Sequence, residues 1–343
     1  MTWLTWRQFR VQAVTAATAL AAFAILLAIT ESHVASLYTT FGVAGCGATC
    51  EHAASSFLAQ VSGIYTDVYT IGIAAVILAP ALIGMFWGAP LIAREIETGT
   101  FRLAWTQTIT RARWLASKLA LPALAAMAVT EGLSLIYGWW SAPIGQAARL
   151  APGANFPTGL SPFSVLAYDS HGIVPLGYAA FAFTLGVTTG TFIRRSVPAM
   201  AVTVAVFTAV MVAMPLGIRP HLFPPLHQNV SVAGQFNGQE SVGGDRFALT
   251  LDYIPGQPGA WIMDSHAVNA AGQPASVIPA ACNSPAGSNN LLQCLASHGI
   301  RVAVTYQPIS RYWAFQWTET AIFLALALAL SGFCYWRISR RLN

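Results

Sequence analysis

Long apolar runs dominate the chain, and short polar or basic segments separate them. Six windows are mainly apolar over about 20 residues, the length that an α-helix needs to cross a bilayer. They cover residues 11–29, 68–92, 115–140, 173–193, 197–216 and 315–336. No convincing small-residue cleavage site follows the first window, so we interpret it as a retained helix and not a removed signal. The pattern predicts an all-α polytopic membrane protein with six transmembrane helices.

Composition agrees with this class, because 55% of the 343 residues are hydrophobic and 8% are charged, with a mean hydropathy of +0.57. Basic residues gather at alternate ends of the windows, and positive residues near span ends stay in the cytoplasm. They are Arg7 and Arg10; Arg94, Arg102, Arg111, Arg113 and Lys118; Arg194 and Arg195; and Arg337, Arg340 and Arg341. We therefore expect both termini in the cytoplasm. The net charge of +5 reflects this topology, and without a nucleic-acid-binding motif no nucleic-acid partner is expected.

Three segments fall on the outer side in this topology, at residues 31–67, 141–172 and 217–312. The last one contains alternating apolar and polar runs at 246–253 and 260–264, separated by Gly and Pro, which indicate short strands. Residues 289–297 are expected to form one short helix. The sequence therefore predicts a small external domain, β-rich or α/β, between the fifth and sixth spans.

Four cysteines lie in these outer segments and a fifth, Cys334, lies at the inner end of the last span. Outer cysteines are free to form disulfides, so Cys46 with Cys50 and Cys282 with Cys294 are the expected local pairs, although spacing alone does not fix connectivity. A zinc site built from Cys46, Cys50, His52 and His33 is the alternative, but their spacing matches no strong template. No metal site is therefore assigned.

Residues 94–113 join the second and third spans and combine charge with an apolar face. Phe101 and Trp105 are four residues apart, so they share one face of a helix, and Gly99 permits a sharp change of direction just before it. Such a helix needs a partner groove. The alternative is an amphipathic segment that lies on the membrane surface.

This segment resembles the signature of ABC-2 type permeases, the membrane subunits of ABC exporters, here of an actinobacterial-like exporter. The matching positions are Glu95, Glu97, Gly99, Thr100, Thr110, Arg111, Lys118 and Leu119. The resemblance implies that residues 94–113 are a cytoplasmic coupling element that docks on a separate ATPase, with Arg94, Phe101 and Trp105 in the same element. Glu95 and Glu97 are then expected at the rim of that interface. The family commonly has proline where this chain has Thr108, so the local turn is expected to differ.

No ATP site is expected within the chain. A phosphate-binding loop needs Gly-Lys followed by Ser or Thr, whereas the only lysine, Lys118, lies between Ser117 and Leu119. No catalytic motif accompanies it, so we expect a transport subunit that is not an enzyme and has no cofactor of its own. The resemblance implies that ATP and Mg are bound by two copies of a partner ATPase, and that a second permease copy completes a homodimer.

Two acidic residues lie inside the predicted spans, Glu131 in the third and Glu319 in the sixth. Carboxylates are costly in a membrane and are functional candidates by default. Both are therefore candidates for the transport pathway. For Glu131 a structural hydrogen-bonding role is an equal alternative, and Glu319 is near enough to the interface to be merely solvated.

The function expected from these features is ATP-driven export of a hydrophobic or amphipathic molecule by alternating access, in the membrane of a bacterial cell and in contact with its lipid. One alternative is an ABC-linked sensor or immunity component that binds a toxic peptide externally. Another is an ATPase-independent channel or secondary transporter, which inverted repeats would favour. The two halves of the sequence show no such repeat.

Overall fold

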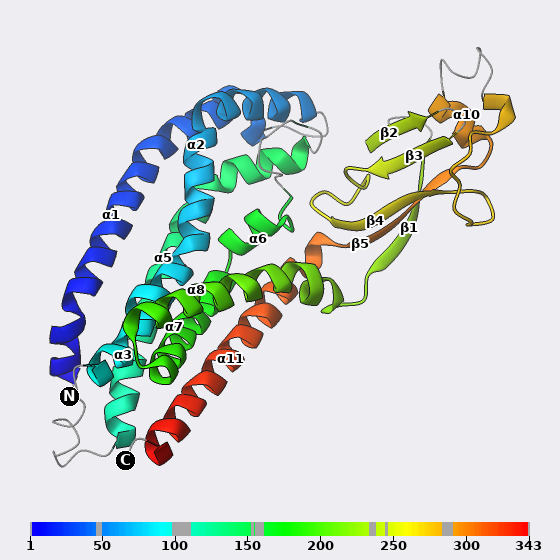
Figure 1. Cartoon of the computed structure of the whole chain (residues 1–343). Coiled ribbons are helices and arrows are strands. Elements are labelled where there is room, and N and C mark those ends of the chain that lie inside the picture. Colours follow the sequence, from blue (N-terminus) through cyan, green and yellow to red (C-terminus); the bar gives the residue numbers. More distant parts are fainter. Residues whose placement is uncertain are drawn as a thin grey trace.

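The computed structural model describes residues 2–45, 50–97, 111–151, 154, 161–232, 238–243, 246–282 and 291–341. Within these residues six helical segments are long and apolar enough to cross a membrane, which confirms the predicted number of spans. They comprise Phe9–Thr40, Glu51–Glu95, Lys118–Leu150, Val174–Ile193, Ser196–His221 and Ile309–Arg337. Both termini lie at one end of the helical bundle, and a β-rich region lies beyond the other end (Figure 1).

The long helices are α1 (Thr2–Thr40), α2 (Glu51–Ile83), α5 (Arg111–Leu150), α7 (Val174–Ile193), α8 (Ser196–Ala213) and α11 (Tyr312–Arg341). Several extend well beyond the apolar windows, so much of segments 31–67 and 141–172 is helical. Hydrophobicity marks the part of a helix that a bilayer covers, whereas breaks in backbone geometry mark its end. After α1, for example, Gly42 adopts a positive φ of 71°, which few other residues tolerate.

Shorter helical elements connect these helices. A π-helical turn, η2 (Gly84–Gly88), joins α2 to α3 (Ala89–Glu97), and a second, η3 (Met214–Ile218), joins α8 to the 3₁₀ turn η4 (Arg219–His221). Helix α6 (Val165–Ser170) precedes α7, and the 3₁₀ turn η6 (Ile309–Arg311) precedes α11.

Helix α7 is the centre of the bundle and is buried along most of its length. It packs against α11, α5, α3 and η2. Gly84 and Gly88 pack against the backbone of α7 around Gly186, and Gly190 packs against Ala89, so these glycines bring the backbones into direct contact. A Cβ at Gly84, for example, would lie 2.6 Å from the carbonyl oxygen of Ala182. Small residues allow this close approach inside a membrane, where burial of apolar surface drives helix association little.

The β-rich region contains five strands in its described part, in two sheets. Strands β1 (Leu226–Ser231), β5 (Arg301–Gln307) and β4 (Trp261–Val268) form an antiparallel sheet with β5 in the middle. Strands β2 (Gly238–Gly243) and β3 (Arg246–Leu251) form a second antiparallel pair. These strands and helix α10 (Leu291–Ser297) enclose a hydrophobic core of their own. The two predicted strands, the predicted short helix and the β-rich character of this region are confirmed.

One predicted disulfide is present, because Cys282 and Cys294 are bonded with their Cα atoms 5.7 Å apart. It fastens α10 to the 3₁₀ turn η5 (Ala280–Cys282). Cys50 is also disulfide-bonded, but the predicted partner, Cys46, lies outside the described residues. Cys334 is free and buried, with its sulfur 3.2 Å from the hydroxyl of Thr188.

Candidate functional site

The coupling element is described only at its two ends. Helix α3 ends at Glu97 and α5 begins at Arg111. The expected docking residues Gly99, Thr100, Phe101 and Trp105 lie between these helices, outside the described residues. What the structure establishes is how the flanking helices are attached to the bundle.

Glu95 attaches α3 to α5 through an ion pair between its Oε1 and the Nζ of Lys118. The lysine side chain is only 8% exposed and the glutamate 19%, so water competes weakly for either charge. The pair joins the helices on both sides of the coupling element, and a partly buried pair is screened less by salt than an exposed one. The only lysine of the chain therefore has a definite structural role.

Glu97 attaches α3 to α8. Its carboxylate accepts hydrogen bonds from the backbone N–H of Ser196 at 3.0 Å and from the Ser196 hydroxyl at 2.8 Å. Because Ser196 is the first residue of α8, the carboxylate satisfies an otherwise unpaired N–H group and lies at the positive end of the helix dipole. These hydrogen bonds lower the pKa of Glu97. Glu95 and Glu97 thus bind elements of their own chain, and their expected place at the rim of an ATPase interface stays a prediction.

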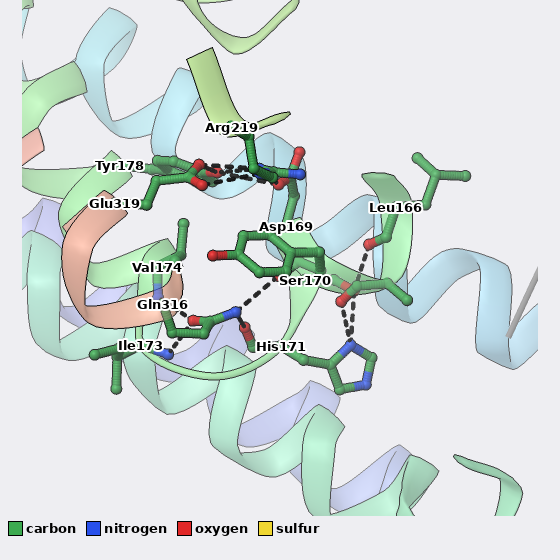
Figure 2. Close-up of polar contacts among 12 residues, drawn as sticks. Leu166, Asp169, Ser170, His171, Ile173, Val174, Tyr178, Arg219, Gln316 and Glu319 are labelled. Carbon is green, nitrogen blue, oxygen red and sulfur yellow. Dashed lines mark hydrogen bonds and ion pairs between the residues drawn. The ribbon is translucent and has the colours of Figure 1, made fainter. Parts of the chain in front are cut away.

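A buried ion cluster lies at the opposite end of the bundle from the termini, where four elements meet (Figure 2). The guanidinium of Arg219 in η4 binds Glu319 of α11 through two bonds, from Nε to Oε2 and from Nη2 to Oε1, both 2.9 Å long. The same guanidinium pairs with Asp169 of α6. The hydroxyl of Tyr178 in α7 lies 2.6 Å from Oε1 of Glu319 and 3.0 Å from Oδ1 of Asp169.

The cluster is closed to solvent, since Arg219, Asp169 and Glu319 are 1%, 3% and 0% exposed. Burial raises the pKa of Asp169 to about 6, although the charge and hydrogen bond of Arg219 oppose this shift. The guanidinium also lies over the ring of Tyr168, 3.9 Å from its centroid, which is close enough for a cation–π contact. The alternative that Glu319 is merely solvated is wrong, because its carboxylate is buried and binds Arg219 and Tyr178.

Gln316 links α11 to the start of α7, next to the ion cluster (Figure 2). Its Oε1 accepts the backbone N–H groups of Ile173 and Val174, both at 3.0 Å, and so caps α7. Its Nε2 donates to the carbonyl of His171 at 3.2 Å. Gly172 has a φ of 76°, and a Cβ there would lie 2.6 Å from Oε1 of Gln316. Glycine is therefore required both by the backbone and by the side chain beside it.

His171 continues this polar chain toward α5. The Oγ of Ser141 lies 2.9 Å from the Nε2 of His171, and the carbonyl oxygen of Ala167 lies 2.7 Å from its Nδ1. Burial lowers the pKa of His171, because a buried imidazolium loses hydration. The surroundings of the ring therefore favour its neutral form.

Two cavities lie beside the cluster. One, of about 510 Å³, lies where the end of α5, residues 161–165 and η4 meet the β-rich region. The other, of about 350 Å³, lies between α5, α6 and α11. Both volumes are within the range of small-molecule sites.

Glu131, the second carboxylate expected in the pathway, is half-buried in α5. Its Oε2 has no hydrogen-bond partner among the described residues. A buried polar atom without a partner is uncommon in proteins. This leaves the pathway role for Glu131 open to test, whereas the cluster engages Glu319.

Sequence reasoning missed Asp169, Tyr178, Arg219 and Gln316. One signal was available, because Arg219 is one of five arginines in the segments expected to face outward, and it follows the apolar fifth window by only three residues. An arginine in that position needs a carboxylate partner nearby. Its partners come from 50 and 100 residues away, so the sequence did not identify them.

The comparisons with known proteins place the chain in a family. Searches of curated proteins and of solved structures found no match. The sequence model of the family described as "ABC-2 membrane transporter related" matches residues 17–219, more than half of the 343 residues. The match includes three of the six spans entirely and most of two others, both described ends of the coupling element, and Arg219. The chain therefore belongs to the ABC-2 membrane transporter related family.

Proposed function

We propose that the chain is the permease subunit of an ATP-driven ABC exporter that moves a hydrophobic or amphipathic molecule outward. A separate ATPase supplies the energy, and a homodimer of the permease with two ATPase subunits is the working assembly. The observation that carries this proposal is the attachment of both ends of the coupling element to the bundle, by Glu95 to α5 and by Glu97 to α8, in a chain of this family.

The proposed orientation places both termini and residues 98–110 in the cytoplasm of a bacterial cell and the β-rich region outside. The distribution of basic residues supports it, because 12 of the 17 Lys and Arg residues flank the span ends on the side of the termini. The disulfide between Cys282 and Cys294 also supports it, since disulfides persist mainly outside the cytoplasm.

In the proposed mechanism, α8 transmits the movement of the coupling element to the buried ion cluster. Closure of the ATPases pushes the coupling element, and the hydrogen bonds between Glu97 and Ser196 carry the displacement to the beginning of α8. At its other end α8 continues through η3 into η4, where Arg219 holds α6 and α11. Because a packed helix moves largely as a rigid element, a push at its beginning tilts the elements around the buried cluster. Alternating access follows from that tilt.

The docking experiment uses the Phe101→Ala, Trp105→Ala double variant. Central aromatic anchors contribute about 2 to 4 kcal/mol each to an interface, so the variant should release the ATPase in a pull-down or uncouple hydrolysis from export. Trp139→Ala is the matched control, because Trp139 is an exposed aromatic of α5 outside the coupling element. Full recovery of the ATPase together with normal coupled export would exclude residues 98–110 as the docking segment.

Two further tests follow from the proposal. The purified chain alone should neither bind nor hydrolyse ATP, because it contains no phosphate-binding loop.

The pathway role of Glu131 is tested by Glu131→Gln. This substitution removes a charge but keeps the shape of the side chain, so we expect normal assembly and altered transport. Unchanged transport of every tested molecule would assign Glu131 to a structural role.

A further inference from the structure

Arg149 lies where the two cavities meet. It is one of two residues that line both, the other being Pro162. It occupies the last turn of α5, at the end of the third span. Its Nε donates to the carbonyl of Gly145 one turn earlier in the same helix, and within the described residues no carboxylate pairs with it. The undescribed residues that follow, 152–153 and 155–160, include no Asp or Glu.

The charges around Arg149 favour an anion in the smaller cavity. Among the described residues that line that cavity, Arg149 is the only Lys or Arg and there is no Asp or Glu. Burial lowers the pKa of His171, which also lines it. Gln146 also lines it and adds an amide group. In the larger cavity Asp252 lies in the wall and Arg219 is already neutralised by its two carboxylates. An anionic group therefore fits on the side of Arg149 that faces the smaller cavity.

The rest of the smaller cavity is largely apolar and aromatic. Ile309 of η6 and Tyr312 and Trp313 at the start of α11 line it, together with Pro162. Trp313 is 56% exposed, and an aromatic residue at the end of a span is typical of the membrane interface. A single cation beside an apolar wall, close to the expected membrane interface, matches a molecule with a charged head and an apolar body.

We propose that this cavity binds an anionic amphipathic molecule, whose carboxylate, sulfate or phosphate head contacts Arg149 while its apolar body lies against Trp313 and Ile309. As the identity of the exported cargo, this assignment rests on the proposed function. As a binding site it can be tested without the ATPase. Both an exported small amphipath and an anionic membrane lipid have the required chemistry.

The experiment measures binding of dansyl-aminoundecanoic acid to the purified chain in neutral maltoside micelles, by energy transfer from tryptophan. Oleate and oleyl alcohol serve as competitors that differ mainly in the charge of the head. A charge-assisted hydrogen bond contributes enough that Arg149→Gln should weaken binding of the probe roughly tenfold. Arg149→Lys should retain most of the affinity. The control is Arg301→Gln, an exposed arginine of β5 that lines neither cavity.

Equal affinity for wild type and Arg149→Gln, or equal displacement by oleate and oleyl alcohol, would overturn the assignment. Displacement by nanodiscs containing phosphatidylglycerol, but not by nanodiscs of phosphatidylcholine alone, would support the site with a membrane lipid as ligand. Displacement by oleate without an effect of phosphatidylglycerol would support it with a free amphipath as ligand. If binding depends on the charge of the ligand but the chain never couples to an ATPase, the binding site stands and only the proposed export is rejected.

Discussion

A single arginine holds together four elements at the end of the bundle away from the termini. Arg219 is 1% exposed and pairs with Asp169 and Glu319. Two buried carboxylates without their cation are costly, so Arg219→Met should lower the free energy of unfolding by about 3 to 5 kcal/mol. Denaturant unfolding in mixed micelles, with Arg301→Gln as the control, would measure it. Loss of less than about 1 kcal/mol would mean that the pairs contribute little.

A neutral replacement of the cluster separates charge from packing. The triple variant Arg219→Met, Asp169→Asn, Glu319→Gln removes all three charges and keeps side chains of similar size. It should recover part of the stability that Arg219→Met loses, because no uncompensated charge remains buried. A triple variant less stable than Arg219→Met alone would show that the ion pairs contribute favourably beyond their own desolvation.

His171 should give the protein an acid-sensitive component of stability. Its pKa is lowered in the folded state by burial, so below the unfolded value of about 6.5 the unfolded chain binds more protons. The contribution of the neutral His171 ring to folding stability is therefore present above the unfolded pKa. It is lost as pH falls through the lower folded pKa. We expect the unfolding midpoint of wild type to fall more between pH 7.5 and 5.5 than that of His171→Gln. Asp169 titrates in both proteins, so its opposite contribution cancels in the comparison, and parallel pH profiles would contradict the prediction.

At the scale of elements, the contact between α7 and the α2–η2–α3 segment depends on glycine. A Cβ at Gly190 would overlap the backbone oxygen of Ala89, whereas a Cβ at Gly332 in α11 would meet nothing within 4 Å. Gly190→Ala should therefore destabilise the protein by about 1 to 3 kcal/mol through overpacking. Gly332→Ala, the matched control, should be neutral or slightly stabilising, since alanine favours a helix interior. Equal unfolding midpoints for the two variants would show that the backbones do not need this close approach.

At the scale of the whole molecule, the spans and the β-rich region have separate hydrophobic cores. The disulfide between Cys282 and Cys294 closes a loop of 12 residues within the second of these. Its loss should destabilise that region by about 2 to 4 kcal/mol and leave the helices intact. The Cys282→Ser, Cys294→Ser variant should therefore be cleaved faster by protease between β1 and β5, with unchanged far-ultraviolet helicity. Cys334→Ser is the control, and equal cleavage rates would contradict the prediction.

Much of the fold could be read from local patterns. Six apolar windows gave six spans, and alternation at residues 246–253 and 260–264 gave β3 and β4. These properties are local, because a span needs only its own length of apolar residues and a half-buried strand only its own alternation. Where the helices end was not predicted, since α1 and α5 continue for several turns past their windows. Their polar ends follow from backbone geometry and not from hydrophobicity.

The sequence by itself therefore determined the membrane class, the number of spans, the strand-forming region and the resemblance to a transporter family. Only the tertiary structure decided what the charged residues do. It placed Glu95 on Lys118, Glu97 on Ser196, and Arg219 between Asp169 and Glu319. The physical reason is that a charge inside a low-dielectric protein is tolerated only beside a partner. Those partners lie 23 to 100 residues away along the chain and become neighbours only when the helices pack.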